Sequence, residues 1–382
     1  MAKNLTEPTY HKSITGPIPR FDDRETGFSR FHRQHLAKPQ ISTEPASAAK
    51  SSTDKFVRGT TTKGGKEKKG YERGNYALAW AGRTIDYMVR KNLYSREPEI
   101  AESKVDVSDK KAITKQVKAA AHWFGADLVG ICEVNPNWIY SHWGDYNAYY
   151  SGGIAKAGDP IEIPSWLKYA VVMAVEMDYK EMSRSPAVDA STILGYAKMS
   201  FVAPSVASFL SQLGFHALPS GNDYALNIPL AIDAGLGELG RNGQIITNEF
   251  GPRVRICKVF TDLPLETDCP ADIGVQAFCE TCEICAKKCP GNAIMSGERT
   301  DKPWDESNNI NLLKWPVKAM NCLNWWEKNG SHCSNCIRTC PFNKPAGWLH
   351  DAIRKVIKTT PVFDTLLAKI DHLLGYGRQI LG

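Results

Sequence analysis

The feature that most constrains this chain of 382 residues is a dense run of cysteines in its last third. Eight of its eleven cysteines lie between Cys279 and Cys340, and the run opens with the pattern CxxCxxCxxxCP, which ends at Pro290. In proteins that carry two iron–sulfur clusters, three cysteines of such a pattern bind one [4Fe–4S] cluster and the fourth binds the other. A cubane needs four thiolates around one small body, and gaps of two residues let a tight loop supply three of them.

A second copy of the pattern, CxxCxxxCP, runs from Cys333 to Pro341 and lacks one early cysteine. Cys322, eleven residues upstream of Cys333, can supply the missing thiolate. We therefore predict two clusters, each with four cysteine ligands. The first set of ligands is Cys279, Cys282, Cys285 and Cys340, and the second set is Cys289, Cys322, Cys333 and Cys336.

Two other uses of cysteine fit this pattern less well. Zinc sites are usually built from separated CxxC pairs or from Cys and His together, not from CxxCxxCxxxCP. A disulfide framework gives no reason for the pattern to repeat. Cys132, Cys257 and Cys269 lie outside both copies, and we expect them to be buried structural thiols.

Composition places the chain among ordinary soluble proteins. Hydrophobic residues make up 42% and charged residues 23% of the chain, and the net charge is +6. The basic run from 63 to 69 is typical of a solvated loop, because it lacks the interleaved aromatic residues of a nucleic-acid surface. No apolar run is long enough to predict a transmembrane helix, and MAKNLTEPTY shows no export signal. If the protein is exported, we expect its leader to have been removed.

Hydrophobic periodicity predicts helices that alternate with short buried strands, which indicates an α/β layer structure. Residues 1 to about 75 show no periodicity, and we expect an extended arm or disorder there. We expect Ser108 to cap one helix and Pro204 to bend another. The expected helices are 75–92, 108–124, 190–213, 225–234 and two between 347 and 374, and the expected strands are 128–132, 169–177 and 254–261.

These elements and the cysteine motifs divide the chain into four parts. Residues 1–107 form an N-terminal arm with a helical segment, and residues 108–262 form an α/β domain. Residues 263–345 form a ferredoxin-like domain for two [4Fe–4S] clusters. Residues 346–382 form C-terminal helices that are expected to pack on the α/β domain.

The stretch from Gly235 to Gly240 matches GxGxxG, the glycine pattern of dinucleotide-binding proteins. That fingerprint requires a strand before it and a helix after it. Here the preceding IPLAIDA has a helical pattern, and the polar residues Arg241 and Asn242 follow. The surroundings therefore argue against a nicotinamide site.

The same stretch resembles a known family, the corrinoid and iron–sulfur reductive dehalogenases. The likeness rests on LGYAKMSF, on GNDYALNIPLAIDAGLGELGRNGQIITNEFGPRVRICKVFTDLPL and on the doubled cysteine block. It runs from about residue 108 to the C-terminus, is strongest from 190 to 345, and is joined by the N-terminal PRFDDRETGFSRF. The resemblance implies an α/β, nitroreductase-like core that binds a cobalamin-type corrinoid and the substrate, with an inserted two-cluster ferredoxin-like domain. Proteins of this family replace a carbon-bound halogen by hydrogen.

The resemblance also assigns catalytic roles. Tyr196 in GYAKM matches the family's tyrosine proton donor, Arg255 in PRVRI matches the arginine beside it, and Asn222 in GNDYA matches a polar residue of the pocket. A neighbouring guanidinium stabilises the phenolate that remains when a phenol gives up its proton. Without the resemblance, Tyr196 would be taken for a packing residue and Arg255 for a surface residue. The residues expected to contact the corrinoid, which the family binds base-off without a histidine ligand, are Tyr196, Asn222, Gly240, Arg241 and Asn242.

Aromatic residues are plentiful and can line a dry pocket for an apolar substrate, or can equally belong to the core. The pairs in question are His122-Trp123, Trp138 with Tyr140, His142-Trp143 and Trp325-Trp326.

The resemblance further implies partners and a location. The substrate is a small halogenated organic molecule, and the electron donor is a quinol-linked membrane protein or a low-potential carrier. A small membrane anchor subunit is expected, and no nucleic acid. The protein would lie on the outer face of the cytoplasmic membrane after leader removal, or in the cytoplasm if it has no leader.

Two other functions compete with this one. Epoxyqueuosine reductase, a related corrinoid and iron–sulfur enzyme that acts on tRNA, generally has an aspartate where Tyr196 lies, and it carries a C-terminal helical-repeat domain. A non-enzymatic two-cluster electron carrier needs only residues 263–345, which would leave the preceding residues without a task. Both alternatives therefore explain less of the sequence.

Overall fold

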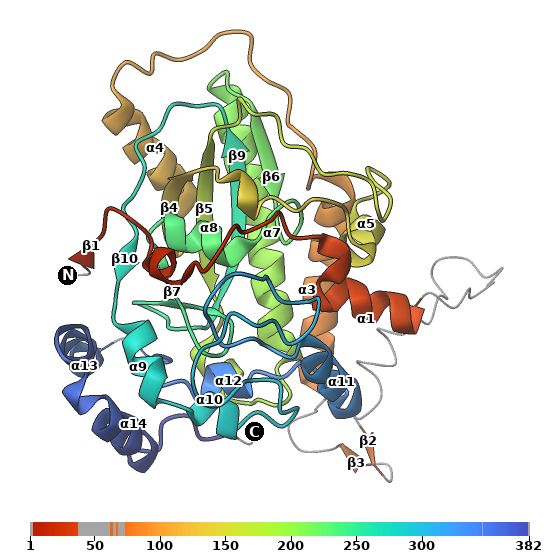
Figure 1. The fold of residues 1–382 in the computed structure, drawn as a ribbon. Helices are drawn as coiled ribbons and strands as arrows, with labels where there is room; N and C mark the ends of the chain where they lie inside the picture. The colour runs from red at the N-terminus through yellow and green to blue at the C-terminus, as the bar shows by residue number, and fades with distance from the viewer. Residues whose placement is uncertain (1–2, 37–61, 64–65, 68–72, 346, 381–382) are drawn as a thin grey trace.

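Figure 1 shows the computed structural model of the chain, which describes residues 3–36, 62–63, 66–67, 73–345 and 347–380. A four-stranded antiparallel sheet fills the centre, in the order β4-β5-β9-β6. Its strands are β4 (Leu128–Glu133), β5 (Tyr169–Glu176), β6 (Ala217–Ser220) and β9 (Val254–Thr261). The three predicted strands are thus confirmed to within a residue at either end.

The strand β6 was not predicted from the sequence, and a comparison with β5 shows why. The residues of β5 from Ala170 to Val175 are all 0% exposed, and a continuous apolar run is typical of a strand covered on both faces. β6 is short and contains Pro219, which cannot donate a ladder hydrogen bond. Proline is tolerated there because β6 is an edge strand.

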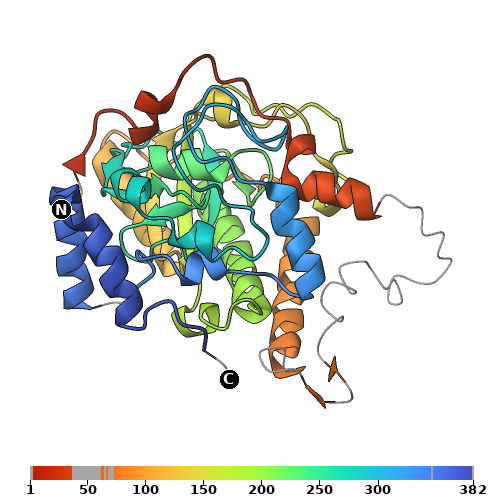
Figure 2. The same ribbon diagram turned by 60° about the horizontal axis from the view of Figure 1, so that its bottom comes forward.

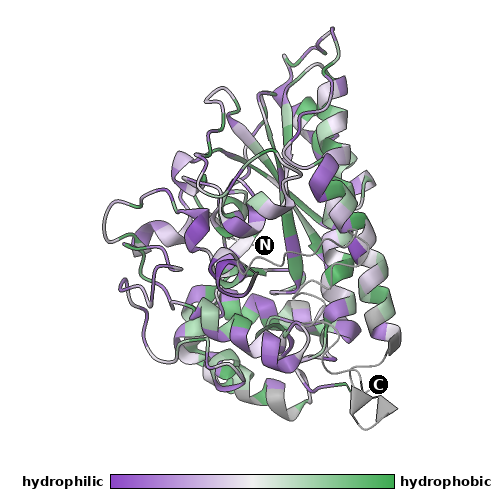
Figure 3. Ribbon diagram, turned by 90° about the vertical axis from the view of Figure 1, so that its right-hand side faces the viewer, coloured by the Kyte–Doolittle hydropathy of each residue, from purple (hydrophilic) through white to green (hydrophobic). Residues whose placement is uncertain are grey.

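Helices cover both faces of the sheet. On one face lie α4 (Lys110–Trp123) and α7 (Asp189–Gln212), and α3 (Arg73–Asn92) packs on α7. On the other face lies α8 (Asn227–Asp233). The expected mixture of helices and sheet is confirmed, although all three strand pairings are antiparallel. Figure 3 shows that apolar residues are concentrated in the strands and in the long helices beside them.

α7 is the one described helix that is long and apolar enough to cross a membrane, by length and composition. Half of its apolar window is buried, and α7 packs between α3 and the strands β9 and β6. Burial of this kind is typical of a core helix. Pro204 lies inside α7, where the sequence analysis placed it.

Two predicted helix starts need correction. Asp109, not Ser108, caps α4, because the Asp109 carboxylate accepts a hydrogen bond from Ala112 N at 2.9 Å. Ser108 instead donates to Asp106. α8 begins two residues later than expected, because Ala225 forms a β-bridge with Ile139.

An N-terminal arm, residues 3–36, runs over the α8 side of the molecule (Figure 2). Its elements are β1 (Lys3–Asn4), which pairs with β10 (Ala271–Asp272), then η1 (Thr9–Ser13), η2 (Asp23–Glu25) and α1 (Gly27–Leu36). α1, which was not predicted, packs on α5 (Asp145–Tyr150) and α11 (Ala319–Asn329). The expectation of an arm or disorder for 37–61, and for most of the basic run, lies outside the described residues.

The cysteine-rich region lies below the sheet in Figure 1 and consists of loops and mostly short helices. Its helices are α9 (Val275–Thr281), α10 (Ile284–Lys287), α11 and α12 (Asn335–Arg338). A hairpin of β7 (Gly237–Leu239) and β8 (Ile245–Thr247) connects the region to the sheet. The remaining short elements are β2 (Thr62–Lys63), β3 (Lys66–Glu67), η3 (Pro136–Trp138) and α6 (Tyr179–Met182).

The C-terminal helices α13 (Trp348–Thr359) and α14 (Asp364–Leu373), joined by η4 (Pro361–Phe363), contact two parts of the chain. Through Ile357 and Leu367 they share an apolar cluster with α9 and the first cysteine loop. Arg354 and Lys358 reach residues 248–249. The helices therefore pack on the cysteine-rich region as well as on the α/β domain, which was the one contact expected.

Candidate functional site

Tyr196, Asn222 and Arg255 meet at one end of the central sheet. Tyr196 lies on α7, Asn222 follows β6, and Arg255 is the second residue of β9. The Tyr196 hydroxyl is 3.3 Å from Asn222 Nδ2 and 3.3 Å from Arg255 Nη1. Two donors from different elements thus converge on one phenol oxygen.

The Tyr196 ring also lies beside two guanidinium groups. Cζ of Arg255 is 4.5 Å and Cζ of Arg90 is 5.0 Å from the ring centroid. Arg90 comes from α3, is buried, and donates through Nε to Asp86 Oδ1 at 2.9 Å. Positive charge this close stabilises the negative charge that a phenol acquires on losing its proton.

Gly195 allows β9 to approach α7 at this point. A Cβ atom at Gly195 would lie 2.9 Å from Arg255 Cγ and 3.3 Å from Met177 Cγ. A larger residue would therefore displace the Arg255 side chain from Tyr196.

The loop that carries Asn222 is held by Lys258, which is 0% exposed in the middle of β9. Lys258 Nζ donates to Gly221 O and Asp223 O, both at 2.7 Å, and to Asn227 Oδ1 at 2.9 Å. Burial lowers the pKa of Lys258 to about 8, and the Asp223 charge opposes that change. One ammonium group on a central strand thus fixes two points of the loop that carries Asn222 and the first residue of α8.

The N-terminal arm supports the same loop from another side. Asp23 Oδ2 accepts hydrogen bonds from Gly144 N at 2.8 Å and from Asn147 Nδ2 at 2.9 Å. Asn147 Nδ2 also lies 3.3 Å from Asn222 O. Burial raises the pKa of Asp23 to about 6, although these hydrogen bonds oppose the rise.

Aromatic side chains from α1, α5 and α11 pack together, and one of them, Tyr146, lies near Tyr196. The Phe28 ring centroid of α1 lies 5.2 Å from that of Tyr146 in α5 and 5.9 Å from that of Trp326 in α11. Burial raises the pKa of Tyr146 to about 12. The Arg90 charge opposes this rise, and Tyr196 adds to it. The three rings form an aromatic wall between α1, α5 and α11, and Tyr146 is the member that lies close to Tyr196.

The aromatic pairs named from the sequence fall into three groups. Trp123 is 86% exposed on the surface and lines no pocket near Tyr196. Trp138, Tyr140 and Trp143 are buried in the core on the α8 face, the alternative that had been kept open. Trp326 joins the wall described above.

The hydrogen-bonding chemistry beside the phenol fits a further bound group. A cavity of about 20 Å³, room for one water molecule, adjoins Asn222. Arg255 Nε is buried and has no hydrogen-bond partner in the described part of the chain. Since a buried donor is seldom left unpaired, this nitrogen fits a ligand that brings an acceptor, such as a halide or a corrin amide.

The eight motif cysteines gather in two sets, and all eleven cysteines are free thiols. Burial raises the pKa of Cys340, and the neighbouring thiols of Cys279, Cys285 and Cys282 raise it further. These four residues are the predicted first set.

The second set shows the same arrangement. Burial raises the pKa of Cys336, with further contributions from Cys322, Cys333 and Cys289 and then from Cys340 of the first set, so the two sets adjoin. Ala293 N donates to Cys289 Sγ at 3.3 Å, and hydrogen bonds to cysteine sulfur tune iron–sulfur clusters. The displaced Cys322 therefore lies among the residues with which it was grouped.

Four thiols in each set fit a cubane cluster. A cubane places its thiolates on four different iron atoms, so they stand further apart than the ligands of a single ion. Within the described residues, no three His, Cys, Asp or Glu side chains converge on one metal ion. The assignment of each thiolate to a cluster stays a prediction.

Of the three remaining cysteines, Cys132 and Cys257 are buried, as predicted. Cys269 is exposed, and that prediction was wrong. Cys269 lies in the irregular connection between β9 and β10, where no strand or helix covers it.

Packing contacts connect the second cysteine set to the neighbourhood of Tyr196. Cys336 packs against a small buried cluster that includes Met177. Met177 Cγ comes within 3.3 Å of a Cβ built at Gly195, next to Tyr196. The first set instead shares its apolar cluster with α13 and α14.

Arg241, expected to contact the corrinoid, is 0% exposed and binds the first cysteine loop. Its Cζ lies 4.4 Å from the Trp315 ring centroid. Its three nitrogens donate, at 2.7–3.1 Å, to the carbonyl oxygens of Cys279, Cys282, Met295 and Gly297. Its contact with a corrinoid stays a prediction.

Gly240 and Asn242 are also engaged within the hairpin. Asn242 Nδ2 lies 3.5 Å from Cys336 O, and Asn242 Oδ1 accepts a hydrogen bond from Gln244 N. A Cβ at Gly240 would lie 2.8 Å from Ile246 Cγ1, so the turn itself requires glycine. The GxGxxG stretch follows helix α8 and leads into strand β7, the reverse of the dinucleotide fingerprint.

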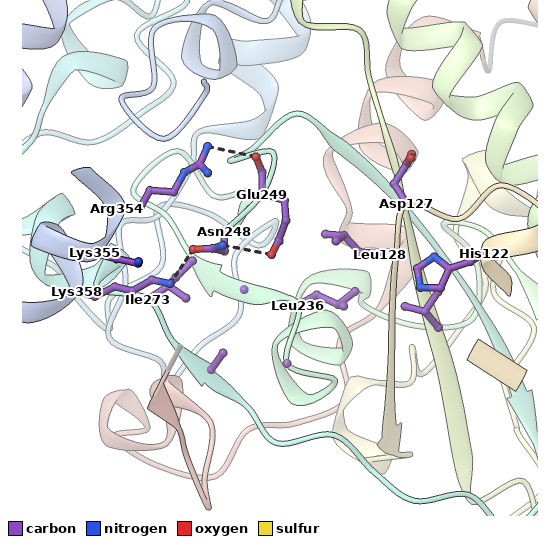
Figure 4. Close-up of a pocket in the computed structure, with 14 residues that line it drawn as sticks. His122, Asp127, Leu128, Leu236, Asn248, Glu249, Ile273, Arg354, Lys355 and Lys358 are labelled. Carbon is purple, nitrogen blue, oxygen red and sulfur yellow. Dashed lines mark hydrogen bonds between the residues drawn. The ribbon is translucent and has the colours of Figure 1, made fainter. Parts of the chain in front are cut away.

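A separate cavity of about 800 Å³ lies beside the start of the edge strand β4 (Figure 4). Arg354, Lys355 and Lys358 of α13 line one wall, and His122 and Asp127 line the wall opposite. Its volume is within the range of small-molecule sites, and the α13 wall is cationic. None of the three catalytic candidates lines it.

Sequence analysis missed the residues that support the catalytic candidates. Lys258 interrupts the apolar run from Ile256 to Phe260, and a lysine within a buried pattern was a signal that could have been used. Arg90, Asp23 and Asn147 carry no such local signal. They reach the site because α3, the arm and α5 fold onto α7 and its neighbours.

Comparisons with known proteins address both parts of this site. The family model of a 4Fe–4S dicluster domain matches residues 278–344. A tetrachloroethene reductive dehalogenase of Desulfitobacterium hafniense is 40% identical over 305 residues, which cover 71% of this chain and 55% of that protein. The chain belongs to the reductive dehalogenase family. A second reductive dehalogenase, also named for tetrachloroethene and from Sulfurospirillum multivorans, is 35% identical over 294 residues, covering 72% of this chain and 59% of that protein.

Solved structures of reductive dehalogenases share the fold. A catabolic reductive dehalogenase matches with a TM-score of 0.76 at 23% identity, covering 99% of this chain and 50% of that one. The chain spans little more than half the length of the curated reductive dehalogenases that it matches.

Proposed function

We propose that this reductive dehalogenase replaces a carbon-bound halogen of a small organohalide by hydrogen, consuming two electrons and one proton and releasing halide. The observation that carries the proposal is the Tyr196 hydroxyl, to which Asn222 and Arg255 donate at 3.3 Å. A phenol oxygen that already accepts from two donors keeps its own hydrogen for a substrate carbon. The relatives named for tetrachloroethene support the reaction class.

The proposal includes two [4Fe–4S] clusters, held by the two cysteine sets, and a corrinoid bound base-off on a nitroreductase-like core. When bound, the corrinoid supplies the strongly reducing centre that the removal of halide requires. One solved reductive dehalogenase is described as B12-dependent, which supports this cofactor.

The side chains of this chain account for the remaining chemistry. Tyr196 holds a proton at its hydroxyl and gives it to the carbon that loses halide. Arg255 and Asn222 stabilise the phenolate that is left, and Arg255 Nε, which is uncommitted, can donate to the departing halide.

The proposal extends to partners and location. Because the first cysteine set lies beneath α13 and α14, we place the approach of the electron donor there. That donor is a quinol-linked membrane protein or a low-potential carrier, with a small membrane anchor subunit, in organohalide respiration. The proposed location is the outer face of the cytoplasmic membrane after leader removal, or the cytoplasm if there is no leader.

Metal content and turnover test the proposal together. Anaerobically prepared or reconstituted protein should hold about eight iron atoms per chain and one cobalt. It should release halide from one or more of a panel of chlorinated alkanes, alkenes and phenols. Zinc as the dominant metal, or cobalt absent after reconstitution, would contradict it. Iron without cobalt would indicate an electron carrier, and reduction of epoxyqueuosine in tRNA would indicate the other rival.

A further inference from the structure

A chain of hydrogen bonds leads from Lys258 to the Tyr196 hydroxyl. Lys258 Nζ is 2.9 Å from Asn227 Oδ1, and Asn227 Nδ2 is 3.0 Å from Asn222 Oδ1. Asn222 Nδ2 is in turn 3.3 Å from the Tyr196 hydroxyl. The four side chains come from β9, α8, the loop after β6, and α7.

The direction of this chain follows from the chemistry of its first member. An ammonium group can only donate, so Asn227 must present its oxygen to Lys258. Its amide nitrogen then faces Asn222 Oδ1, and also Gly221 O at 3.1 Å and Ile256 O at 3.4 Å, which can only accept. Asn222 is thereby left with its own amide nitrogen turned toward the phenol.

The phenol oxygen consequently accepts a hydrogen bond from Asn222, and the Tyr196 O–H group does not donate one to it. Arg255 Nη1 approaches the same oxygen at 3.3 Å and can only donate. The Tyr196 hydrogen has no acceptor in this group. A reversed Asn222 amide would present an oxygen and capture that hydrogen.

We propose that Lys258 and Asn227 are positioning residues that orient the Asn222 amide, so that the Tyr196 hydrogen is kept for the substrate. This inference rests on the proposed role of Tyr196 as proton donor. Neither positioning residue touches the reacting atoms. Their effect is transmitted through hydrogen-bond polarity alone.

A pair of substitutions at Asn227 separates polarity from packing. Asn227→Asp keeps the size of the side chain and its contact with Lys258, but a carboxylate only accepts, so the Asn222 amide must reverse to donate to it. Asn227→Ala removes the contact and leaves Asn222 free to keep its orientation toward Tyr196. If polarity matters, the Asp variant is the slower one. If only packing matters, the Ala variant is the slower one.

The expected result is a fall in kcat of about tenfold or more for Asn227→Asp, limited by the loss of general acid catalysis, roughly 10²–10⁴-fold. Asn227→Ala should lose less than that. KM should stay within about twofold in both variants, and the solvent deuterium isotope effect on kcat should rise in Asn227→Asp, because proton transfer becomes slower. Equal loss in both variants, a slower Ala variant or an unchanged isotope effect would overturn the inference.

A second pair covers the case in which Asn227→Asp does not fold. Asn222→Asp presents an acceptor directly to the Tyr196 hydroxyl, whereas Asn222→Ala presents nothing, so the Asp variant should again be slower. Both pairs are compared at equal iron and cobalt content. A wild type without dehalogenation would refute the proposed function, whereas an active wild type with the opposite order of variants would refute only this inference.

Discussion

The central sheet and the cysteine-rich region each contain a fully buried cation that donates only to uncharged oxygen atoms, and the two cations stabilise their surroundings differently. Lys258 in β9 and Arg241 in the β7–β8 hairpin are both 0% exposed. Neither hydrogen bonds to a carboxylate among the described residues. Each donates instead to oxygen atoms of a neighbouring loop, which offsets the lost hydration of a buried charge.

The difference lies in what holds the loop. Lys258 stands on a strand that is paired on both sides, so the loop that carries Asn222 is held from a rigid base. Arg241 lies in a hairpin turn, and the segments to which it donates are loops and short helices. We therefore expect the cysteine-rich region to depend for its shape on Arg241 and on the proposed clusters, because bound metal contributes folding free energy. We therefore expect the sheet end to keep its structure after substitutions or metal loss that disrupt the cysteine-rich region.

The largest expected effect comes from removing a cluster ligand. Cys322→Ala should abolish turnover, because the cluster of the second set loses a thiolate while the first set keeps all four. Spectroscopy of the reduced protein should show one cluster lost or converted to a three-iron form. Cys269→Ala, at an exposed cysteine outside both sets, is the matched control and should change nothing. Two intact clusters in Cys322→Ala would mean that another cysteine is the ligand.

The next effect concerns the sheet end alone. Tyr196→Phe keeps the ring between its neighbours and removes the transferable proton, so turnover should fall by roughly 10²–10⁴-fold. Iron and cobalt content should not change, because the phenol ligates neither. The measurement is dehalogenation rate per bound cobalt. A variant with full metal content and near-normal turnover would show that water or another side chain protonates the product.

A smaller effect tests the dependence of the cysteine-rich region on Arg241. Arg241→Met leaves buried carbonyl oxygens without their donor and should lower the free energy of unfolding by about 3 kcal/mol. Arg299→Met is the control. Cζ of Arg299 lies 5.7 Å from the centroid of the same Trp315 ring, but Arg299 forms a partly exposed ion pair with Glu280. That change should cost about 0–1 kcal/mol. The measurement is the free energy of unfolding of both variants in denaturant. Equal losses would show that the buried Arg241 contributes no more to stability than the partly exposed Arg299.

The last effect is confined to one pH range: it is a pH dependence in the arm that supports the loop carrying Asn222. The folded-state pKa of Asp23 is raised to about 6 from 3.8, because burial disfavours the carboxylate. The folded chain therefore holds this proton more tightly than the unfolded chain, and stability is lost as pH rises from about 4 to about 6. Asp23→Asn cannot ionise, so it should remove up to about 3 kcal/mol of that loss.

Unfolding free energies of wild type and Asp23→Asn at pH 4 and pH 7 measure this difference. The neighbouring Asp22 is the control with the opposite sign: burial opposes the change, but hydrogen bonds from Arg24 lower its pKa. Asp22→Asn should therefore lose a little stability at pH 7 and none at low pH. If Asp23→Asn also lost stability at pH 7, the hydrogen bonds that the Asp23 carboxylate accepts would outweigh the effect of its burial on the pKa.

How much the sequence could predict also differs between the two regions. In the cysteine-rich region the spacing of the motifs already implied two sets of four, including the displaced Cys322, because cluster ligands are grouped by short loops. The buried strands were recognisable for a similar reason, since an apolar run such as YAVVMAVEM is a local signal. The short edge strand β6 and the helix α1 carried no such signal.

The sequence by itself determined the positions of the cysteine motifs and the main helices and strands of the sheet domain. It also gave two predicted thiolate sets and, through the family motifs, the three catalytic candidates. Tertiary structure alone decided that Arg90, Asn147 and Asp23 support them, and that Arg241 binds the first cysteine loop. It also decided the direction of the hydrogen bonds between Lys258 and Tyr196. The physical reason is range: periodicity and loop spacing act over a few residues, whereas a hydrogen-bond chain requires donors and acceptors that the fold brings together from distant segments.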